Sequence, residues 1–183
     1  MQTFISFLRG VNITGHNSIK MTDLAALYRN LGFISTETYI QSGNVIFKSD
    51  TDSPVSDLAF TIEQAILDRF IYNIPVMIRT VPEMREIISS NPFLSEEKFD
   101  PSKIAVIFLH EKVSIAQIQK VSDVDYPPDK FKIIGKEIFT FCPNGFGKTR
   151  LYTNFFEQKM GVTGTARNWK TITTIFKIAE DLK

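Results

Sequence analysis

A glycine-rich turn followed by two cations is the stretch of this sequence best suited to chemistry. The turn, residues 142–147, follows an apolar segment at 138–141, and Lys148 and Arg150 come directly after it. We expect the triplet Lys148-Thr149-Arg150 to open an amphipathic helix, because apolar residues recur at Leu151, Phe155 and Met160. A helix N-terminus offers unpaired N–H groups and the positive end of its dipole. The pattern therefore predicts a site for an anion.

The same stretch carries only half of the Gly-x-x-x-x-Gly-Lys-[Ser/Thr] pattern of a P-loop. Gly147, Lys148 and Thr149 match its second half, but Cys142 stands where the first glycine is required. The preceding strand belongs to a predicted hairpin, whereas a P-loop strand lies in a parallel sheet, and no acidic strand end follows to hold Mg²⁺. Two interpretations remain: a simpler anion site, or a helix cap at Thr149 with two solvated cations.

Three further polar clusters fall at predicted strand or helix ends. At the cluster of Arg167 and Asn168, either Thr165 or Asn168 is expected to cap the final helix, with Trp169 packed beneath it and Arg167 pointing outward. Polar residues at such positions can serve turn geometry alone, but several clusters in one chain favour a shared site. The clusters are Arg9, Asn12 and Lys20; Gln41, Ser42 and Asn44; Arg167 and Asn168.

Metal and thiol chemistry have little support in the sequence. His16 and His110 are the only histidines and Cys142 is the only thiol, so no zinc-ligand spacing is present. A nucleophilic Cys142 would need a base partner, and the sequence identifies none. We therefore expect no metal site and no cofactor.

Composition places the chain among ordinary globular proteins. Its 183 residues are 43% hydrophobic and 22% charged, which suits one domain or two small subdomains. A net charge of +1 argues against bulk polyelectrolyte binding but permits a local basic patch. A single cysteine suggests a reducing compartment. No apolar run approaches the ~20 residues of a membrane span, so we expect a cytoplasmic protein with no membrane association.

Periodicity and turn signals divide the chain into two similar halves. In the first, strands at 3–8, 34–41, 44–48 and 74–79 and helices beginning near Thr22 and Pro54 give the order β-α-β-β-α-β. In the second, strands at 104–109, 131–134 and 138–141 and two helices give β-α-β-β-α, followed by residues 165–169 and a terminal helix. Capping boxes are predicted at Thr80–Glu83 and Ser114–Gln117.

The predicted fold class is therefore α+β: two ferredoxin-like halves with antiparallel sheets, the second ending in a C-terminal helix. We place the first subdomain at residues 1–94 and the second at 95–183, and the two can equally be counted as one domain.

Several motifs closely resemble the bacterial family catalogued as domain of unknown function 1697. They are the segments 8–12 and 38–47, then Asn91-Pro92-Phe93, Gly147-Lys148-Thr149-Arg150-Leu151 and Thr165-Ala166-Arg167-Asn168-Trp169, in the family's order. One departure is that the family usually has Ser-Lys-Leu where this chain has Lys148-Thr149-Arg150-Leu151. The resemblance implies a compact α+β protein with ferredoxin-like halves, and it supplies no established activity or catalytic residue.

We expect an anionic partner, a phosphorylated small molecule such as a nucleotide, or nucleic acid. One alternative is a metal-independent enzyme on a small anionic substrate, with Asp23, Glu37 or Tyr39 as acid–base candidates. Another is an interaction module with an exposed apolar sheet face, and the oligomeric state stays open. The expected ligand-binding residues are Arg9, Asn12, Lys20, Gln41, Ser42, Asn44, Lys148, Arg150, Arg167 and Asn168.

Overall fold

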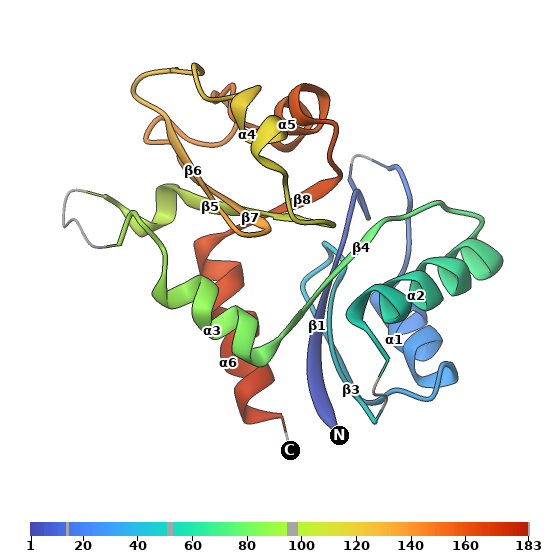
Figure 1. The fold of residues 1–183 in the computed structure, drawn as a ribbon. Coiled ribbons are helices and arrows are strands. Elements are labelled where there is room, and N and C mark those ends of the chain that lie inside the picture. Colours follow the sequence, from blue (N-terminus) through green and yellow to red (C-terminus); the bar gives the residue numbers. More distant parts are fainter. Residues whose placement is uncertain (14, 51–52, 95–98, 183) are drawn as a thin grey trace. The chain divides into compact units, whose positions relative to one another are not determined.

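A computed structural model describes residues 1–13, 15–50, 53–94 and 99–182 of the chain. They form two four-stranded sheets with helices, as Figure 1 shows, and every strand pairing in both sheets is antiparallel. The chain divides into two compact units, which we call unit 1 (Met1–Glu86 with Thr174–Lys183) and unit 2 (Ile87–Thr173). The α+β class with two antiparallel sheets is confirmed.

Unit 1 contains the predicted β-α-β-β-α-β order with the sheet order β2-β3-β1-β4. A helix, α3 (Val81–Ser89), follows the fourth strand. The elements of the repeat are β1 (Gln2–Leu8), α1 (Met21–Asn30), β2 (Ile34–Tyr39), β3 (Asn44–Ser49), α2 (Val55–Phe70) and β4 (Val76–Thr80).

Unit 2 repeats that order in full, with the equivalent sheet order β6-β7-β5-β8. The segment that we expected to follow the repeat outside the sheet is in fact its fourth strand, β8, in which Arg167 lies opposite Val106. The last helix follows directly. The elements are η1 (Pro101–Lys103), β5 (Ile104–Leu109), α4 (Ile115–Gln119), β6 (Lys130–Ile134), β7 (Glu137–Phe141), α5 (Thr153–Met160), β8 (Gly164–Asn168) and α6 (Trp169–Asp181), whose residues from Thr174 onward are counted with unit 1.

The helix starts test the capping predictions individually. At Thr80, the backbone N–H and the hydroxyl both donate to Glu83 Oε2, which confirms the first capping box before α3. Ser114 and Gln117 form the second one before α4. The helix expected to begin near Thr22 begins at Met21, after Lys20, and has no side-chain cap.

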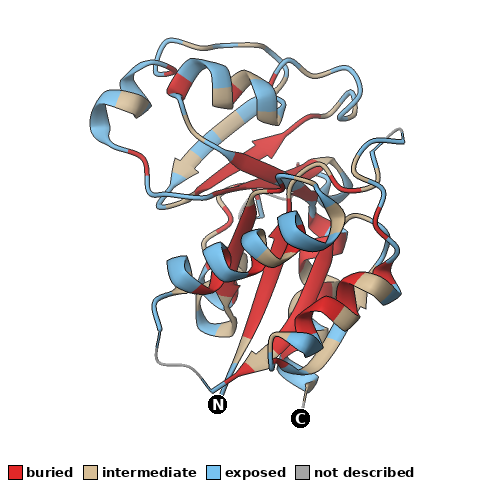
Figure 2. Cartoon of the chain, turned by 90° about the vertical axis from the view of Figure 1, so that its right-hand side faces the viewer, coloured by how far each residue is buried: buried red, intermediate tan, exposed pale blue. Residues whose placement is uncertain are grey.

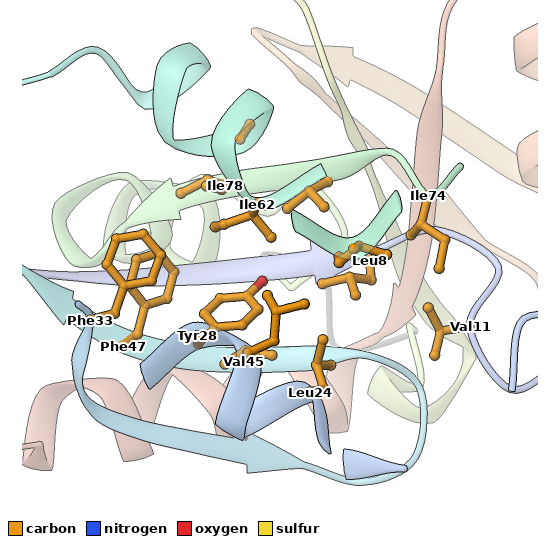
Figure 3. Close-up of a cluster of buried hydrophobic side chains, with 14 of the residues drawn as sticks. Leu8, Val11, Leu24, Tyr28, Phe33, Val45, Phe47, Ile62, Ile74 and Ile78 are labelled. Carbon is orange, nitrogen blue, oxygen red and sulfur yellow. The ribbon is translucent and has the colours of Figure 1, made fainter. Parts of the chain in front are cut away.

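The core of unit 1 fills the space between its sheet and the helices α1 and α2. The rings of Phe33 and Phe47 lie 4.6 Å apart, and Tyr28 meets Phe47 edge-on at 5.2 Å (Figure 3). The Tyr28 hydroxyl is 2.7 Å from Ser6 Oγ, so the one polar group of this cluster is paired. Burial of such large rings stabilises the fold.

Most residues of β1, β3, β4, β5 and β7 are buried, whereas no residue of the edge strands β2 and β6 is buried (Figure 2). Every residue of β5 and of β7 is buried. The exposed apolar sheet face expected of an interaction module is therefore not found on these two strands. No helix within the described residues is long and apolar enough to cross a bilayer.

Candidate anion-binding pocket

The loop between β7 and α5, residues 142–152, is a braced turn and not the start of a helix. The helix α5 begins only at Thr153, so the prediction that Lys148, Thr149 and Arg150 open it is wrong. Two successive turns form instead. The Gly145 N–H donates to the Cys142 carbonyl at 2.9 Å, and the Lys148 N–H donates to the Gly145 carbonyl at 3.1 Å. The cations are therefore held by loop hydrogen bonds, away from the helix dipole.

Thr149, between the two cations, is bonded within the loop. Its Oγ1 accepts the Leu151 N–H at 2.9 Å, and its hydroxyl also bonds the Cys142 thiol. Thr149 is half-buried, whereas Lys148 and Arg150 on either side of it are exposed. Lys148 and Arg150 nevertheless line the same pocket.

The Cys142 thiol lies fully buried beneath this loop. Burial raises the pKa of the Cys142 thiol above its ordinary value of 9.0, since a thiolate would lose its hydration there. Its bond to Thr149 acts in the opposite direction, and the nearby negative charge of Asp129 raises the pKa further. The thiol therefore stays protonated and serves as a loop brace.

A second, proline-stiffened turn faces the cation loop. Tyr126 and Asp129 form an isolated bridge around Pro127 and Pro128, with the Asp129 N–H donating to the Tyr126 carbonyl at 2.9 Å. Proline fixes φ, so the turn loses little freedom on folding. The Arg150 guanidinium lies 5.3 Å above the Tyr126 ring, a cation–π contact that joins the two loops.

Tyr126 is in turn tied to the core of unit 2 by a series of rings. It meets Phe155 edge-on at 5.8 Å, Phe155 meets Phe156 at 5.1 Å, and Phe131 packs on Phe156 at 5.2 Å. The residue that orients Arg150 is therefore itself supported by α5 and β6. This support makes the Arg150 position largely preorganised.

Between the two loops lies a pocket of about 360 Å³, which we call the Lys148 pocket. It sits at the end of the sheet where β6 begins and β7 ends, because Lys130 pairs with Phe141. Within the described part of the chain, no ion pair within 4 Å joins its cations to its carboxylates. The lining residues are Asp125, Tyr126, Pro127, Pro128, Asp129, Asn144, Lys148 and Arg150.

Unit 1 gathers a different polar cluster, which we call the Asn12 corner. Asn12 Nδ2 donates to the carbonyls of Ile19 at 2.9 Å and Gln41 at 2.8 Å, and its Oδ1 accepts the Ile19 N–H at 2.9 Å. One amide thus ties the loop after β1 to the β2–β3 turn. Lys20 and Gln41 flank it with exposed side chains.

The β2–β3 turn is built by its own polar residues. Asn44 is fully buried, and its Nδ2 donates to the Tyr39 carbonyl at 3.0 Å and to Ser42 Oγ at 2.9 Å. Gly43 has φ +70°, and its carbonyl accepts the Leu8 N–H at 2.8 Å. Arg9 follows at the end of β1, half-buried, with its backbone N–H bonded to the Pro75 carbonyl.

Of Arg167 and Asn168, only Asn168 has the role predicted from the sequence. Asn168 Oδ1 accepts the Thr171 N–H at 2.8 Å, so Asn168 caps α6 as predicted. Arg167, expected to point outward, is only 8% exposed. Its Nη1 donates to Thr165 Oγ1 and the Ala166 carbonyl, both at 2.8 Å, and burial lowers the pKa of Arg167 to about 10.

The sequence did not identify three residues that line the pocket, or one buried cation elsewhere. Asp125, Tyr126 and Asp129 lie outside every predicted strand and helix, although the Tyr-Pro-Pro-Asp run is a strong turn signal. Arg79, 2% exposed on β4, was read as part of a strand. A cation inside an apolar strand was the signal that could have identified it. Asp23, Glu37 and Tyr39 lie on α1 and β2 of unit 1 and do not line the Lys148 pocket.

The described residues contain no group of three or more His, Cys, Asp or Glu side chains arranged to hold a metal ion. A family model described as "Protein of unknown function (DUF1697)" matches residues 1–139. No curated protein matches the chain. Among solved structures, a conserved bacterial protein, SP0830 from Streptococcus pneumoniae, is similar at 21% identity and a TM-score of 0.77, covering 97% of this chain and 98% of the other. At this identity the similarity concerns the fold.

Proposed function

We propose a function for this chain, which belongs to the DUF1697 family of proteins of unknown function: it binds a small anionic ligand in the Lys148 pocket. The observation that carries the proposal is that two cations from one braced loop, Lys148 and Arg150, line a pocket of about 360 Å³. Pockets for small ligands typically begin near ~300 Å³. The ligand is therefore a small molecule and not a polymer.

The two cations supply complementary contacts to an anion such as a phosphate group. Arg150 offers a planar fork of donors, and the Tyr126 ring at 5.3 Å limits the orientations it can take. Lys148 adds a mobile point charge two residues away. Asn144, exposed and without a hydrogen bond in the described residues, adds an amide that can donate or accept.

The test is calorimetric titration with pyrophosphate at low ionic strength, repeated as a thermal-shift measurement. The wild-type chain should bind, and the double variant Lys148→Ala/Arg150→Ala should lose at least about tenfold in affinity, since charge-assisted bonds contribute about 1.5–3 kcal/mol each. Raising the salt concentration should weaken binding as well.

Two controls locate the site. The variant Arg29→Ala/Lys132→Ala removes the same two charge types from exposed positions outside the pocket and should bind as the wild type does. Lys20→Ala removes a cation of the Asn12 corner. Loss of binding in Lys20→Ala, with normal binding in the Lys148→Ala/Arg150→Ala variant, would move the site to that corner and overturn the proposal. Tighter binding of a single-stranded oligonucleotide than of pyrophosphate would overturn the choice of a small ligand.

A further inference from the structure

The two walls of the Lys148 pocket carry opposite charges, and this division narrows the class of ligand. Lys148 and Arg150 come from the loop at 142–152, whereas Asp125 and Asp129 come from the facing turn. Resting on the proposed anion site, we infer that the ligand is a phosphate ester of a sugar or polyol. Its phosphate contacts the two cations and its hydroxyl groups donate to the two carboxylates.

The two carboxylates of the pocket, Asp125 and Asp129, require hydrogen-bond donors from a ligand. An ionised Asp has acceptor oxygens and no donor, so only a group with O–H or N–H hydrogens can satisfy it. Asp129 is half-buried at the turn, and its charge is felt by the Cys142 thiol beneath the opposite loop. A bare phosphate ion meets this negative charge without relieving it, which weakens its binding.

Hydroxyl groups reach two carboxylates more readily than a single ligand ammonium group does. A phosphate monoester carries about −1.5 to −2 charges at neutral pH, and the two cations can pair with it. The hydroxyls of a polyol place donors at several positions and can replace the water bound to both carboxylates, whereas an ammonium group carries its donors on one atom. An ammonium group would also have to lose its own strong hydration to enter.

The pocket volume also exceeds the size of a free phosphate ion. A volume of about 360 Å³ lies in the range of pockets that hold small organic ligands. A phosphate group occupies only a fraction of that space. A sugar-sized body fills the remainder and brings several donors to one wall.

The experiment compares three probes on the full chain by calorimetry: inorganic phosphate, glucose 6-phosphate and phosphoethanolamine. Glucose 6-phosphate should bind about tenfold more tightly than phosphate, as expected for one or two hydrogen bonds to charged acceptors. In the isosteric variant Asp125→Asn/Asp129→Asn, phosphate should bind more tightly than to the wild type, because repulsion is removed. The advantage of glucose 6-phosphate should fall to about threefold or less.

Tighter phosphate binding together with a smaller advantage of glucose 6-phosphate cannot result from misfolding, which would weaken both affinities. The control Asp68→Asn/Asp181→Asn removes exposed carboxylates outside the pocket and should leave both affinities unchanged. If phosphate binds through Lys148 and Arg150 but glucose 6-phosphate binds no more tightly, the anion site stands and this inference is wrong. Tightest binding of phosphoethanolamine would also overturn it, in favour of an ammonium-bearing ligand.

Discussion

The two units share one β-α-β-β-α-β repeat but lengthen opposite ends of it. In unit 1 the long connection, residues 9–20, follows the first strand and meets the β2–β3 turn. In unit 2 the equivalent connection spans only 110–114, and the long loops are 120–129 and 142–152. Because neighbouring strands are antiparallel, these loops meet at the other end of the sheet.

The two units show that polar loop residues have two roles: some hold loops together, and others are left available for a ligand. In the Asn12 corner, the amides of Asn12 and Asn44 are occupied by backbone groups and hold the loops together. In the Lys148 pocket, backbone bonds and Thr149 hold the loop, and the side chains of Lys148 and Asn144 have no partner among the described residues. The first arrangement stabilises a fold, whereas the second can bind a ligand.

A likeness at the fourth strand shows that the two units still correspond residue by residue there. Arg79 on β4 and Arg167 on β8 are both buried, and each donates through Nη1 to the carbonyl of the residue before it, at 2.8 Å. In both units the next residue, Thr80 or Asn168, caps the following helix. The repeat therefore keeps the buried arginine and the helix cap at its fourth strand, whereas its loops differ between the units.

The largest effect is expected from substituting one glycine in each unit, Gly43 in the β2–β3 turn and Gly147 in the pocket loop. Gly43→Ala should destabilise the chain by about 3 kcal/mol, because φ is +70° and a Cβ would lie 2.8 Å from Leu8 Cβ. Gly147→Ala in the pocket loop should change stability by less than about 0.5 kcal/mol, since nothing lies within 4 Å of its Cβ. Urea unfolding followed by circular dichroism measures both. Equal losses of stability in Gly43→Ala and Gly147→Ala would contradict the expected difference between the two loops.

The two asparagines give a test of intermediate size. Asn12→Ala should cost about 2 kcal/mol, because it removes three hydrogen bonds and places alanine at φ +57°. Asn144→Ala should leave unfolding almost unchanged and weaken pyrophosphate binding in the same calorimetric assay. A stable Asn12→Ala variant would show that the corner is not a brace.

Element order was predictable because apolar periodicity and turn residues are local signals. The hairpins, the capping boxes at Thr80 and Ser114, and the cap at Asn168 all followed from short patterns. The start of α5 did not, since Leu151 and Phe155 match a helical period although residues 148–152 are held by turn bonds. A period alone does not mark where a helix begins.

The site was less predictable, because facing loops are joined only by tertiary contacts. Lys148 and Arg150 were identified from charge and glycine content, but Asp125 and Asp129 lie about 20 residues earlier, in a turn with no binding pattern of its own. Burial of Arg167 was missed because residues 164–168 were not recognised as a strand. Asparagine patterns in loops also did not distinguish a brace from a ligand contact.

The smallest predicted effect compares two buried acidic groups, one from each unit, by their pH dependence. Burial raises the pKa of the Cys142 thiol in unit 2 and of the Tyr28 hydroxyl in unit 1, so the folded state keeps both protonated. Above the unfolded-state pKa, only the unfolded chain loses these protons, and stability falls as pH rises.

For Cys142 this decline begins near pH 9 and for Tyr28 near pH 10, from their ordinary values of 9.0 and 10.0. Between pH 8 and pH 10 the wild-type free energy of unfolding should therefore fall by about 1 kcal/mol more than that of Cys142→Ala. Tyr28→Phe should lower stability at every pH, because it loses the bond to Ser6, yet keep the decline over this range. A decline that persists in Cys142→Ala would show that the thiol beneath the Lys148 pocket is not held protonated by burial.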